Sequence, residues 1–205
     1  KLFFENVIQD KAKENDIEKC IESARKSNIH FLSFRCNAND KLSIKNIQKY
    51  NFKLIECLVT FEIKNQFTKN ELYTNIRKAE KKDSKLIQHI SSSSFIFDRF
   101  NTDSFFEDNA SLIKINWVIN SFLDKSKNIH IIHHNNDKKK LIGFCVSNLS
   151  ENNLNIELIA IDKKFRRNGY GKILLEGVGN VFYKKKIRCI RVGTQTSNLN
   201  GINFY

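Results

Sequence analysis

The sequence predicts a mixed α/β fold with a central, mostly antiparallel sheet, preceded by a small α/β subdomain. The prediction rests on the period of the apolar residues, which changes between helical and strand spacing along the chain. Glycine is confined to the last third of the chain, so any special backbone conformation is expected there. Apolar residues make up 40% of the 205 residues, including 17 phenylalanines, whereas a disordered chain would be poor in both. The chain is therefore long and apolar enough for one large core or two small ones.

Residues 1–65 alternate between helical and strand patterns. A helix is expected over 16–26, where apolar residues recur at helical spacing, and 29–36 alternates as a strand. A second helix over 43–50 stops at an asparagine, and a strand follows over 53–63. We assign this part to an N-terminal α/β subdomain, in which we find no catalytic signature.

The polar stretch 66–85 predicts a linker or a connecting helix, and 86–205 are assigned to a second domain. This domain opens with helical patterns over 86–124. An aromatic and charged loop at 97–106 interrupts them, and either contacts substrate or is an ordinary surface loop. Three strands of an antiparallel meander are then expected, over 128–134, 141–148 and 154–161.

The third of these strands loses its alternation towards its end, where Leu158 is followed by three apolar residues. A β-bulge near Leu158 and Ile159 would interrupt the pattern in this way, and so would a strand buried on both faces. A loop, a helix from about Gly171 and a strand over 187–192 follow. Together these elements predict a strand, loop, helix and strand crossover unit.

The loop RRNGYGK, residues 166–172, joins the strand to the helix of this unit. A helix N-terminus offers unpaired N–H groups and the positive end of the helix dipole, so it suits an anion. Gly169 and Gly171 would let a phosphate approach the backbone, and two arginines and a lysine add positive charge. The pattern R-x-x-G-x-G is neither a dinucleotide fingerprint nor a P-loop, and a tight turn with incidental arginines is the alternative.

The segment IELIAIDKKFRRNGYGKILLEGV, residues 156–178, resembles motif A of the GNAT family of N-acetyltransferases, whose signature is (Q/R)-x-x-G-x-(G/A). Residues 191–205 resemble the later motif of that family, with Asn198, a glycine at the usual alanine position and a final Phe-Tyr pair. IELIAID, VGTQ and N-x-x-x-x-x-F-Y together look most like the branch of TDP-fucosamine acetyltransferases, which acetylate nucleotide-linked amino sugars. The resemblance is specific over 141–205 and weak before it.

The resemblance implies the GNAT acyl-CoA N-acyltransferase fold and an acetyl-CoA-dependent enzyme, in which a small amine attacks the thioester directly. Backbone amides of the glycine loop would hold the coenzyme A pyrophosphate, and the end of the preceding strand would bind the pantetheine and polarise the thioester carbonyl. Tyr205 matches the general acid of the family. Glu157 could deprotonate the ammonium through water, or be a satisfied strand residue facing a lysine. The implied cofactor-binding residues are Ile159, Ala160, Ile161, Arg166, Arg167, Asn168, Gly169, Tyr170, Gly171, Lys172 and Asn198.

The implied acceptor is a nucleotide-linked amino sugar of the TDP-4-amino-4,6-dideoxyhexose type, made for surface polysaccharide. Acetylation of a protein or peptide lysine or N-terminus is a second hypothesis, and a non-catalytic basic binding module with a GNAT-like fold is a third. The protein could form a homodimer. Family members continue beyond the position of Tyr205, so this sequence is expected to lack the C-terminal strands of the domain.

The charge and composition of the sequence argue against a nucleic-acid-binding protein, a membrane-spanning protein and a metal site. The net charge of +13 is spread along the chain rather than clustered, so we expect no dedicated nucleic-acid role. The sequence contains no run of about 18 apolar residues, the length needed to cross a membrane. We therefore expect a cytoplasmic protein with reduced cysteines. The five cysteines contain no C-x-x-C pair, and His133 and His134 would point to opposite faces of a strand, so no metal is expected.

Overall fold

The computed structural model describes residues 4–8, 14–64, 73–135, 137–185 and 187–205. The chain forms two compact units, Lys1–Ile55 and Glu56–Tyr205. Within the described residues, no helix combines the length and the apolar character needed to cross a membrane.

The first unit is a two-stranded parallel sheet with two helices. In chain order its elements are β1 (Phe4–Ile8), α1 (Glu14–Lys26), β2 (Phe31–Arg35) and α2 (Lys41–Lys49). Both helices and β2 confirm the sequence patterns, whereas β1 was not expected. Ile17 of α1 and Ile47 of α2 form the buried centre of this unit, and Asp40 caps α2 by accepting a hydrogen bond from the Ser43 amide.

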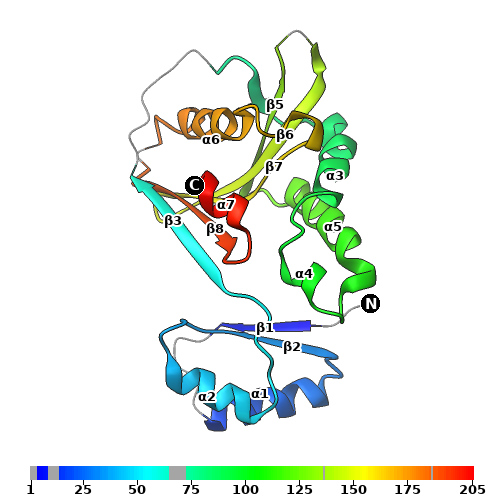
Figure 1. Ribbon diagram of the computed structural model, residues 1–205, viewed down its shortest axis with the longest axis vertical. Coiled ribbons are helices and arrows are strands. Elements are labelled where there is room, and N and C mark those ends of the chain that lie inside the picture. Colours follow the sequence, from blue (N-terminus) through cyan, green and yellow to red (C-terminus); the bar gives the residue numbers. More distant parts are fainter. Residues whose placement is uncertain (1–3, 9–13, 65–72, 136, 186) are drawn as a thin grey trace. The chain divides into compact units, whose positions relative to one another are not determined.

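The second unit is built on a six-stranded sheet in the order β3-β8-β7-β6-β5-β4 (Figure 1). Its strands are β3 (Leu58–Lys64), β4 (Ile76–Lys78), β5 (Lys127–His134), β6 (Asp137–Ser150), β7 (Asn153–Ile161) and β8 (Cys189–Gln195). β7 and β8 are parallel, and the other neighbouring strands of this sheet are antiparallel. The predicted mixed, mostly antiparallel sheet is therefore confirmed.

Helices cover both faces of this sheet, as Figure 1 shows. They are α3 (Ser84–Ser92), α4 (Arg99–Thr102), α5 (Ala110–Leu123), α6 (Tyr170–Val181) and α7 (Leu199–Phe204), with short 3₁₀ turns at Lys81–Asp83, Glu107–Asn109 and Lys163–Phe165. Leu154 and Leu174 are fully buried in the cluster between the sheet and α6, which we call the α6 cluster. Phe144 and Val118 are fully buried in the cluster on the α3 and α5 face, the α5 cluster.

Both edge strands of the sheet come from segments that the sequence patterns placed elsewhere. The strand expected over 53–63 was assigned to the N-terminal subdomain, but Leu58–Lys64 pairs antiparallel with β8. In the stretch predicted as a linker or helix, Ile76–Lys78 pairs with β5, and residues 65–72 lie outside the described part. We expected further C-terminal strands beside β8, but β3 pairs with that edge of β8.

Candidate active site

The parallel pairing of β7 with β8 stops part-way along both strands. Ile156 and Val192 are the last paired residues. Beyond them, the end of β7 pairs with β6, and the end of β8 pairs with β3. Strands that diverge in this way leave backbone N–H and C=O groups on their facing edges, which an extended ligand can bind.

A β-bulge lies at the point of divergence. Val146 pairs with Leu158 and Ser147 pairs with Ile156, so Glu157 is the extra residue in β7. The bulge predicted from the broken alternation is therefore confirmed, one residue earlier than expected.

Glu157 lines an open cavity of about 380 Å³ on the α5 side of the sheet. Its carboxylate accepts hydrogen bonds from Lys127 Nζ and from the side-chain amide of Asn148. The wall of the cavity also includes Trp117, Asn120, Ser121 and Leu158. Glu157 thus makes the lysine contact that its structural alternative predicted, at the place where the strands diverge.

The loop between β7 and α6 depends on two residues in the left-handed region, Arg167 with φ 65° and Gly169 with φ 77°. A Cβ added to Gly169 would meet no heavy atom within 4 Å, so the positive φ alone explains this glycine. The Asn168 side chain shapes the loop by donating to the carbonyls of Phe165, at 3.3 Å, and Arg166, at 2.9 Å.

α6 begins at Tyr170, one residue before the expected start, and its N-cap residue Gly169 has no side chain to cap it. Ile173 donates a helical hydrogen bond to the Gly169 carbonyl at 3.2 Å, and the amides before it in the first turn have no partner within the helix. Residues 162–172 contain five cationic side chains and one acidic side chain. Orphan amides, the helix dipole and these charges make the loop suited to a phosphate.

Gly171 is explained by the packing of a helix, whereas we expected it to let a phosphate approach the backbone. A Cβ at this position would lie 3.0 Å from the ring of Phe204. The glycine therefore lets α7 pack against the first turn of α6, which brings the end of the chain to the loop.

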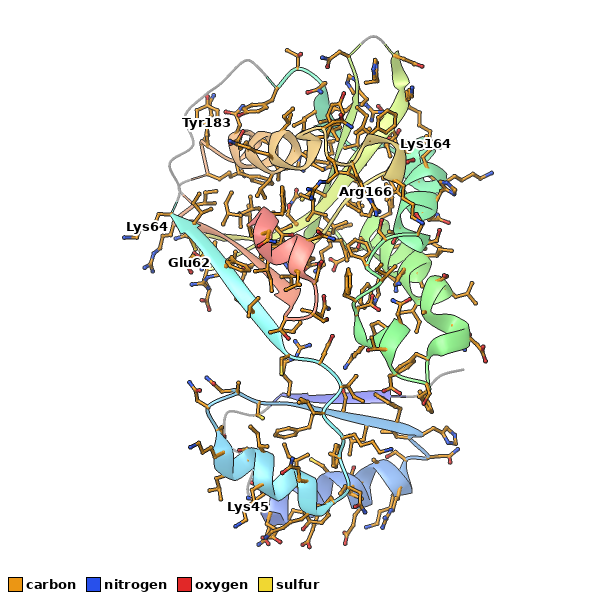
Figure 2. The ribbon with its side chains drawn as sticks, in the orientation of Figure 1. Lys45, Glu62, Lys64, Lys164, Arg166 and Tyr183 are labelled. Atoms are coloured by element: carbon orange, nitrogen blue, oxygen red, sulfur yellow. The ribbon has the colours of Figure 1, made fainter. Side chains whose placement is uncertain are left out.

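The Arg166 side chain turns away from the helix N-terminus. Its Nε donates to the Ile161 carbonyl at 2.9 Å, and its Nη2 donates to Ser94 Oγ at 3.2 Å. Arg166 is labelled in Figure 2. Lys172, in the first turn of α6, is 76% exposed at its side chain, and its Nζ lies 3.9 Å from Glu176 Oε1 across one helical turn. The guanidinium of Arg166, which we expected to add charge for the cofactor, is thus engaged by two acceptors of the protein itself.

Tyr205, the residue after α7, is half-buried against the α6 cluster. Its ring centroid lies 5.8 Å from that of Phe61 in β3 and 4.9 Å from that of Phe204. Burial raises the pKa of Tyr205 above its usual value, and the nearby Cys145 raises it further. The phenol is therefore protonated at neutral pH, as a proton donor must be.

Asn198 is the N-cap of α7. Its Oδ1 accepts from the Gly201 amide at 3.0 Å, and its Nδ2 donates to Thr194 Oγ1 at 3.0 Å. A Cβ at Gly201 would lie 2.5 Å from Asn198 Nδ2, so the glycine makes room for the cap. Asn198 therefore helps to place Tyr205 by fixing the start of its helix.

Four of the thirteen predicted site residues, Ile159, Ile161, Tyr170 and Tyr205, pack against the α6 cluster. Ala160 faces the other way, into the α5 cluster. The Glu157 side chain lines the cavity on the α5 side. Tyr205 and Glu157 therefore approach the divergence of β7 and β8 from opposite faces of the sheet.

Three contributors were missed from the sequence: Phe61, which contacts Tyr205, Cys145, which raises the Tyr205 pKa, and Ser94, which contacts Arg166. Each acts through a tertiary contact between distant segments, and no local pattern marks it. Among the described residues, no group of three or more His, Cys, Asp and Glu side chains could hold a metal ion.

Residues 88–205 match the model of the acetyltransferase (GNAT) family, which is more than half of the chain. The chain belongs to the GNAT family. It is therefore an acetyltransferase of the GNAT type, as its motifs predicted, and its family uses acetyl-CoA.

Solved structures share the GNAT fold at low sequence identity. A conserved protein of unknown function from Staphylococcus epidermidis is 16% identical with a TM-score of 0.70, over 96% of this chain and 77% of that chain. The PaiA N-acetyltransferase of Thermoplasma acidophilum, solved in complex with coenzyme A, is 20% identical with a TM-score of 0.50, over 63% of this chain and 84% of that chain. No curated protein sequence matches this GNAT chain. The narrower resemblance to TDP-fucosamine acetyltransferases finds no support in these likenesses and stays a prediction.

Proposed function

We propose that this GNAT protein transfers the acetyl group of acetyl-CoA to a small amine, which attacks the thioester carbonyl directly. The observation that carries the proposal is the divergence of β7 and β8, with an uncapped helix N-terminus beside it and a half-buried tyrosine against it. The diverging strands would bind the thioester arm of coenzyme A, the helix N-terminus would bind its diphosphate, and the tyrosine would protonate the leaving thiolate.

Three parts of the chain fit coenzyme A. The amides of residues 167–172 would hold the pyrophosphate, with charge from Arg167 and Lys172. The end of β7, Ile159 to Ile161, would bind the pantetheine by its backbone, and an N–H there would polarise the carbonyl. Asn198 would lie beside the cofactor through its place at the start of α7. Acetyl-CoA supplies an activated acyl group, and the protein supplies position and proton transfer.

Two side chains would move protons. As the new C–N bond forms and the C–S bond breaks, Tyr205 would give its proton to the departing thiolate. Glu157 would take a proton from the amine through water, on the opposite face of the sheet. In this arrangement the amine enters from the α5 side and the thiol leaves on the α7 side.

The proposed acceptor is a nucleotide-linked amino sugar. It is supported by the resemblance of residues 156–205 to the branch that acetylates such sugars. The cavity of about 380 Å³ beside Glu157 has the size of a small-ligand site, and Asn120, Ser121 and Trp117 offer hydrogen-bonding groups and an aromatic face to a sugar.

The test is to incubate the protein with acetyl-CoA and a TDP-4-amino-4,6-dideoxyhexose and to measure release of free thiol. Turnover on the sugar but not on lysine peptides is expected. Turnover on peptides alone would overturn the acceptor, and a melting temperature that acetyl-CoA does not raise would overturn the cofactor.

The Tyr205→Phe variant tests the proton donor. We expect kcat to fall by about 100-fold or more, the usual contribution of general acid catalysis, with an unchanged dissociation constant for acetyl-CoA. A variant as active as the wild type would remove Tyr205 from the mechanism.

A further inference from the structure

One side chain joins the loop before α6 to the segment after α3. Arg166 Nε donates to the carbonyl of Ile161, the last residue of β7, and its Nη2 donates to the hydroxyl of Ser94. A guanidinium presents its donors in a rigid planar fork, so it can hold two acceptors at once in a fixed geometry. The contact therefore fixes the loop, the strand end and the α3 segment relative to each other.

Ser94 is a firm anchor for this contact. It is only 5% exposed, and its hydroxyl donates to the Ile90 carbonyl of α3 at 2.7 Å. A hydroxyl has one proton and two lone pairs, so with its proton on Ile90 it presents a lone pair to Arg166.

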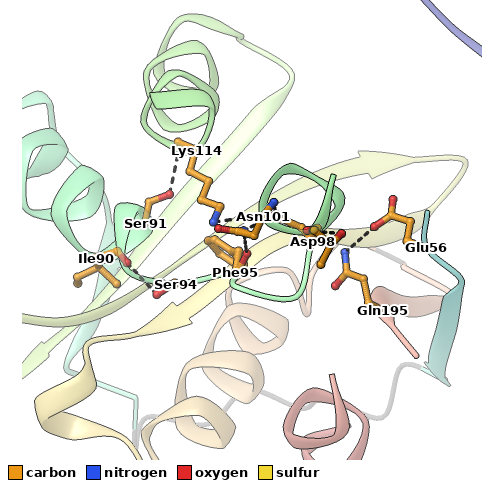
Figure 3. Close-up of polar contacts among 10 residues, drawn as sticks. Glu56, Ile90, Ser91, Ser94, Phe95, Asp98, Asn101, Lys114 and Gln195 are labelled. Atoms are coloured by element: carbon orange, nitrogen blue, oxygen red, sulfur yellow. Dashed lines mark hydrogen bonds and ion pairs between the residues drawn. The ribbon is translucent and has the colours of Figure 1, made fainter. Parts of the chain in front are cut away.

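The segment after Ser94 is held by further polar contacts, which Figure 3 shows. Phe95 has a left-handed backbone with φ 56°, and its carbonyl accepts from Asn101 Nδ2 at 2.9 Å. The same amide nitrogen donates to Asp98 Oδ1 at 2.6 Å, and Asp98 Oδ2 lies 3.8 Å from Lys114 Nζ in α5. A displacement of Ser94 is therefore passed on to α4 and α5 rather than absorbed by a loose loop.

α5 continues from Lys114 to the wall of the cavity beside Glu157. Trp117, Asn120 and Ser121 all lie on its following turns and line that cavity. A chain of contacts thus runs from the loop that suits a phosphate to the side of the sheet where the acceptor cavity lies.

We propose that Arg166 is a positioning residue that couples the acetyl-CoA loop to the acceptor-side segment 94–101, so that acetyl-CoA binding orders this segment through the Ser94 hydroxyl. The proposal rests on the proposed cofactor. Because energetic coupling is reciprocal, an ordered segment 94–101 also strengthens cofactor binding. Arg167 and Lys172 then supply the positive charge at the pyrophosphate. Arg166 instead links the cofactor loop to the acceptor-side segment.

Hydrogen exchange with acetyl-CoA as the only ligand tests the coupling without an acceptor. In the wild-type protein, acetyl-CoA should slow amide exchange at 167–173 and also at 94–101, the latter by about fivefold, the contribution of one hydrogen bond. Ser94→Ala should keep the protection at 167–173 and lose it at 94–101.

Ser93→Ala is the matched control, because the Ser93 hydroxyl donates to the same Ile90 carbonyl, at 3.3 Å, and makes no contact with Arg166 among the described residues. It should behave as the wild type at both segments. Equal protection at 94–101 in the Ser94→Ala and Ser93→Ala variants would overturn the coupling.

Arg166→Lys separates position from charge, because lysine keeps the charge but cannot hold two acceptors in a planar fork. It should lose the protection at 94–101 and weaken acetyl-CoA binding by no more than about fivefold, the factor that the coupling itself contributes, and adding Ser94→Ala should cause no further loss. A tenfold weaker acetyl-CoA affinity with protection retained would instead make Arg166 a pyrophosphate ligand and overturn the proposal. Absence of protection at 167–173 in the wild type would overturn the cofactor assignment itself.

Discussion

Gly169 is one of the two left-handed residues on which the conformation of the loop before α6 depends. With φ 77° it occupies the left-handed region, where a side chain costs about 1–2 kcal/mol. Gly169→Ala should lower the free energy of unfolding by about 1 kcal/mol and weaken acetyl-CoA binding, as measured by urea denaturation and titration. Gly193→Ala is the control, because its backbone has no positive φ and its nearest Cβ neighbour lies at 3.8 Å. Equal losses in both variants would contradict this reading.

The Asp98 and Lys114 pair is buried, and desolvation opposes both charges. It raises the pKa of Asp98 and lowers the pKa of Lys114. Lys114→Met should cost about 3 kcal/mol of unfolding free energy at pH 7, because it leaves a buried carboxylate without its cation, and Asp98→Asn in the same chain should recover most of it.

This loss should also depend on pH. Without Lys114 the folded-state pKa of Asp98 rises further, so the folded state binds a proton more tightly than the unfolded state. The stability gained from that proton is present at low pH and is lost as pH rises through the folded-state pKa. Urea denaturation should therefore show a smaller loss at about pH 5 than at pH 7. An equal loss at both would show that the Asp98 charge is not its cause.

At the scale of elements, the strands and helices whose pattern is local could be predicted. β5, β6 and β7 follow from alternation, α6 follows from helical spacing, and the bulge is one of the two explanations that the break in alternation near Leu158 allowed. β3 was found as a strand but assigned to the N-terminal subdomain, because its partner β8 is remote in sequence and alternation does not identify a partner. The three-residue β4 is too short to show a period.

The packing of α6 on β4 gives an element-scale prediction. A Cβ at Gly177 would lie 2.0 Å from Ile76 Cδ1, so Gly177→Ala gains about 1 kcal/mol of helix propensity but meets an overpacking cost of about 1–3 kcal/mol. A net loss of about 1 kcal/mol is expected in the free energy of unfolding.

Ile76→Val removes the crowding Cδ1 atom and serves as the second arm of this test. The double variant should be more stable than the sum of the two single effects, because the two changes share one contact. Additive losses would show that Gly177 is not required by Ile76.

At the scale of the whole molecule, the local part of the site could be predicted and the tertiary part could not. The loop residues Asn168 to Lys172 and the final tyrosine lie within short motifs, so their spacing alone places them near a helix N-terminus and a helix end. The side-chain direction of Arg166 depends on Ser94, which α3 supplies. The surroundings of Tyr205 depend on Phe61, which only the pairing of β3 with β8 brings to it.

The contact between Phe61 and Tyr205 therefore links the first strand of the second unit to the proposed proton donor. Burial is the larger cause of the raised Tyr205 pKa, and Phe61→Ala removes part of that cover. The pKa of Tyr205 should then fall towards the usual value of about 10, so that the alkaline loss of kcat begins at a lower pH than in the wild type. Leu58→Ala is the control, since Leu58 lies in the same strand and is 43% exposed. The pKa of Tyr205 is measured from tyrosinate absorbance as pH rises, with the Tyr205→Phe variant subtracted to isolate this residue. If Phe61→Ala does not move the alkaline loss of kcat, β3 does not set the pKa of the proton donor.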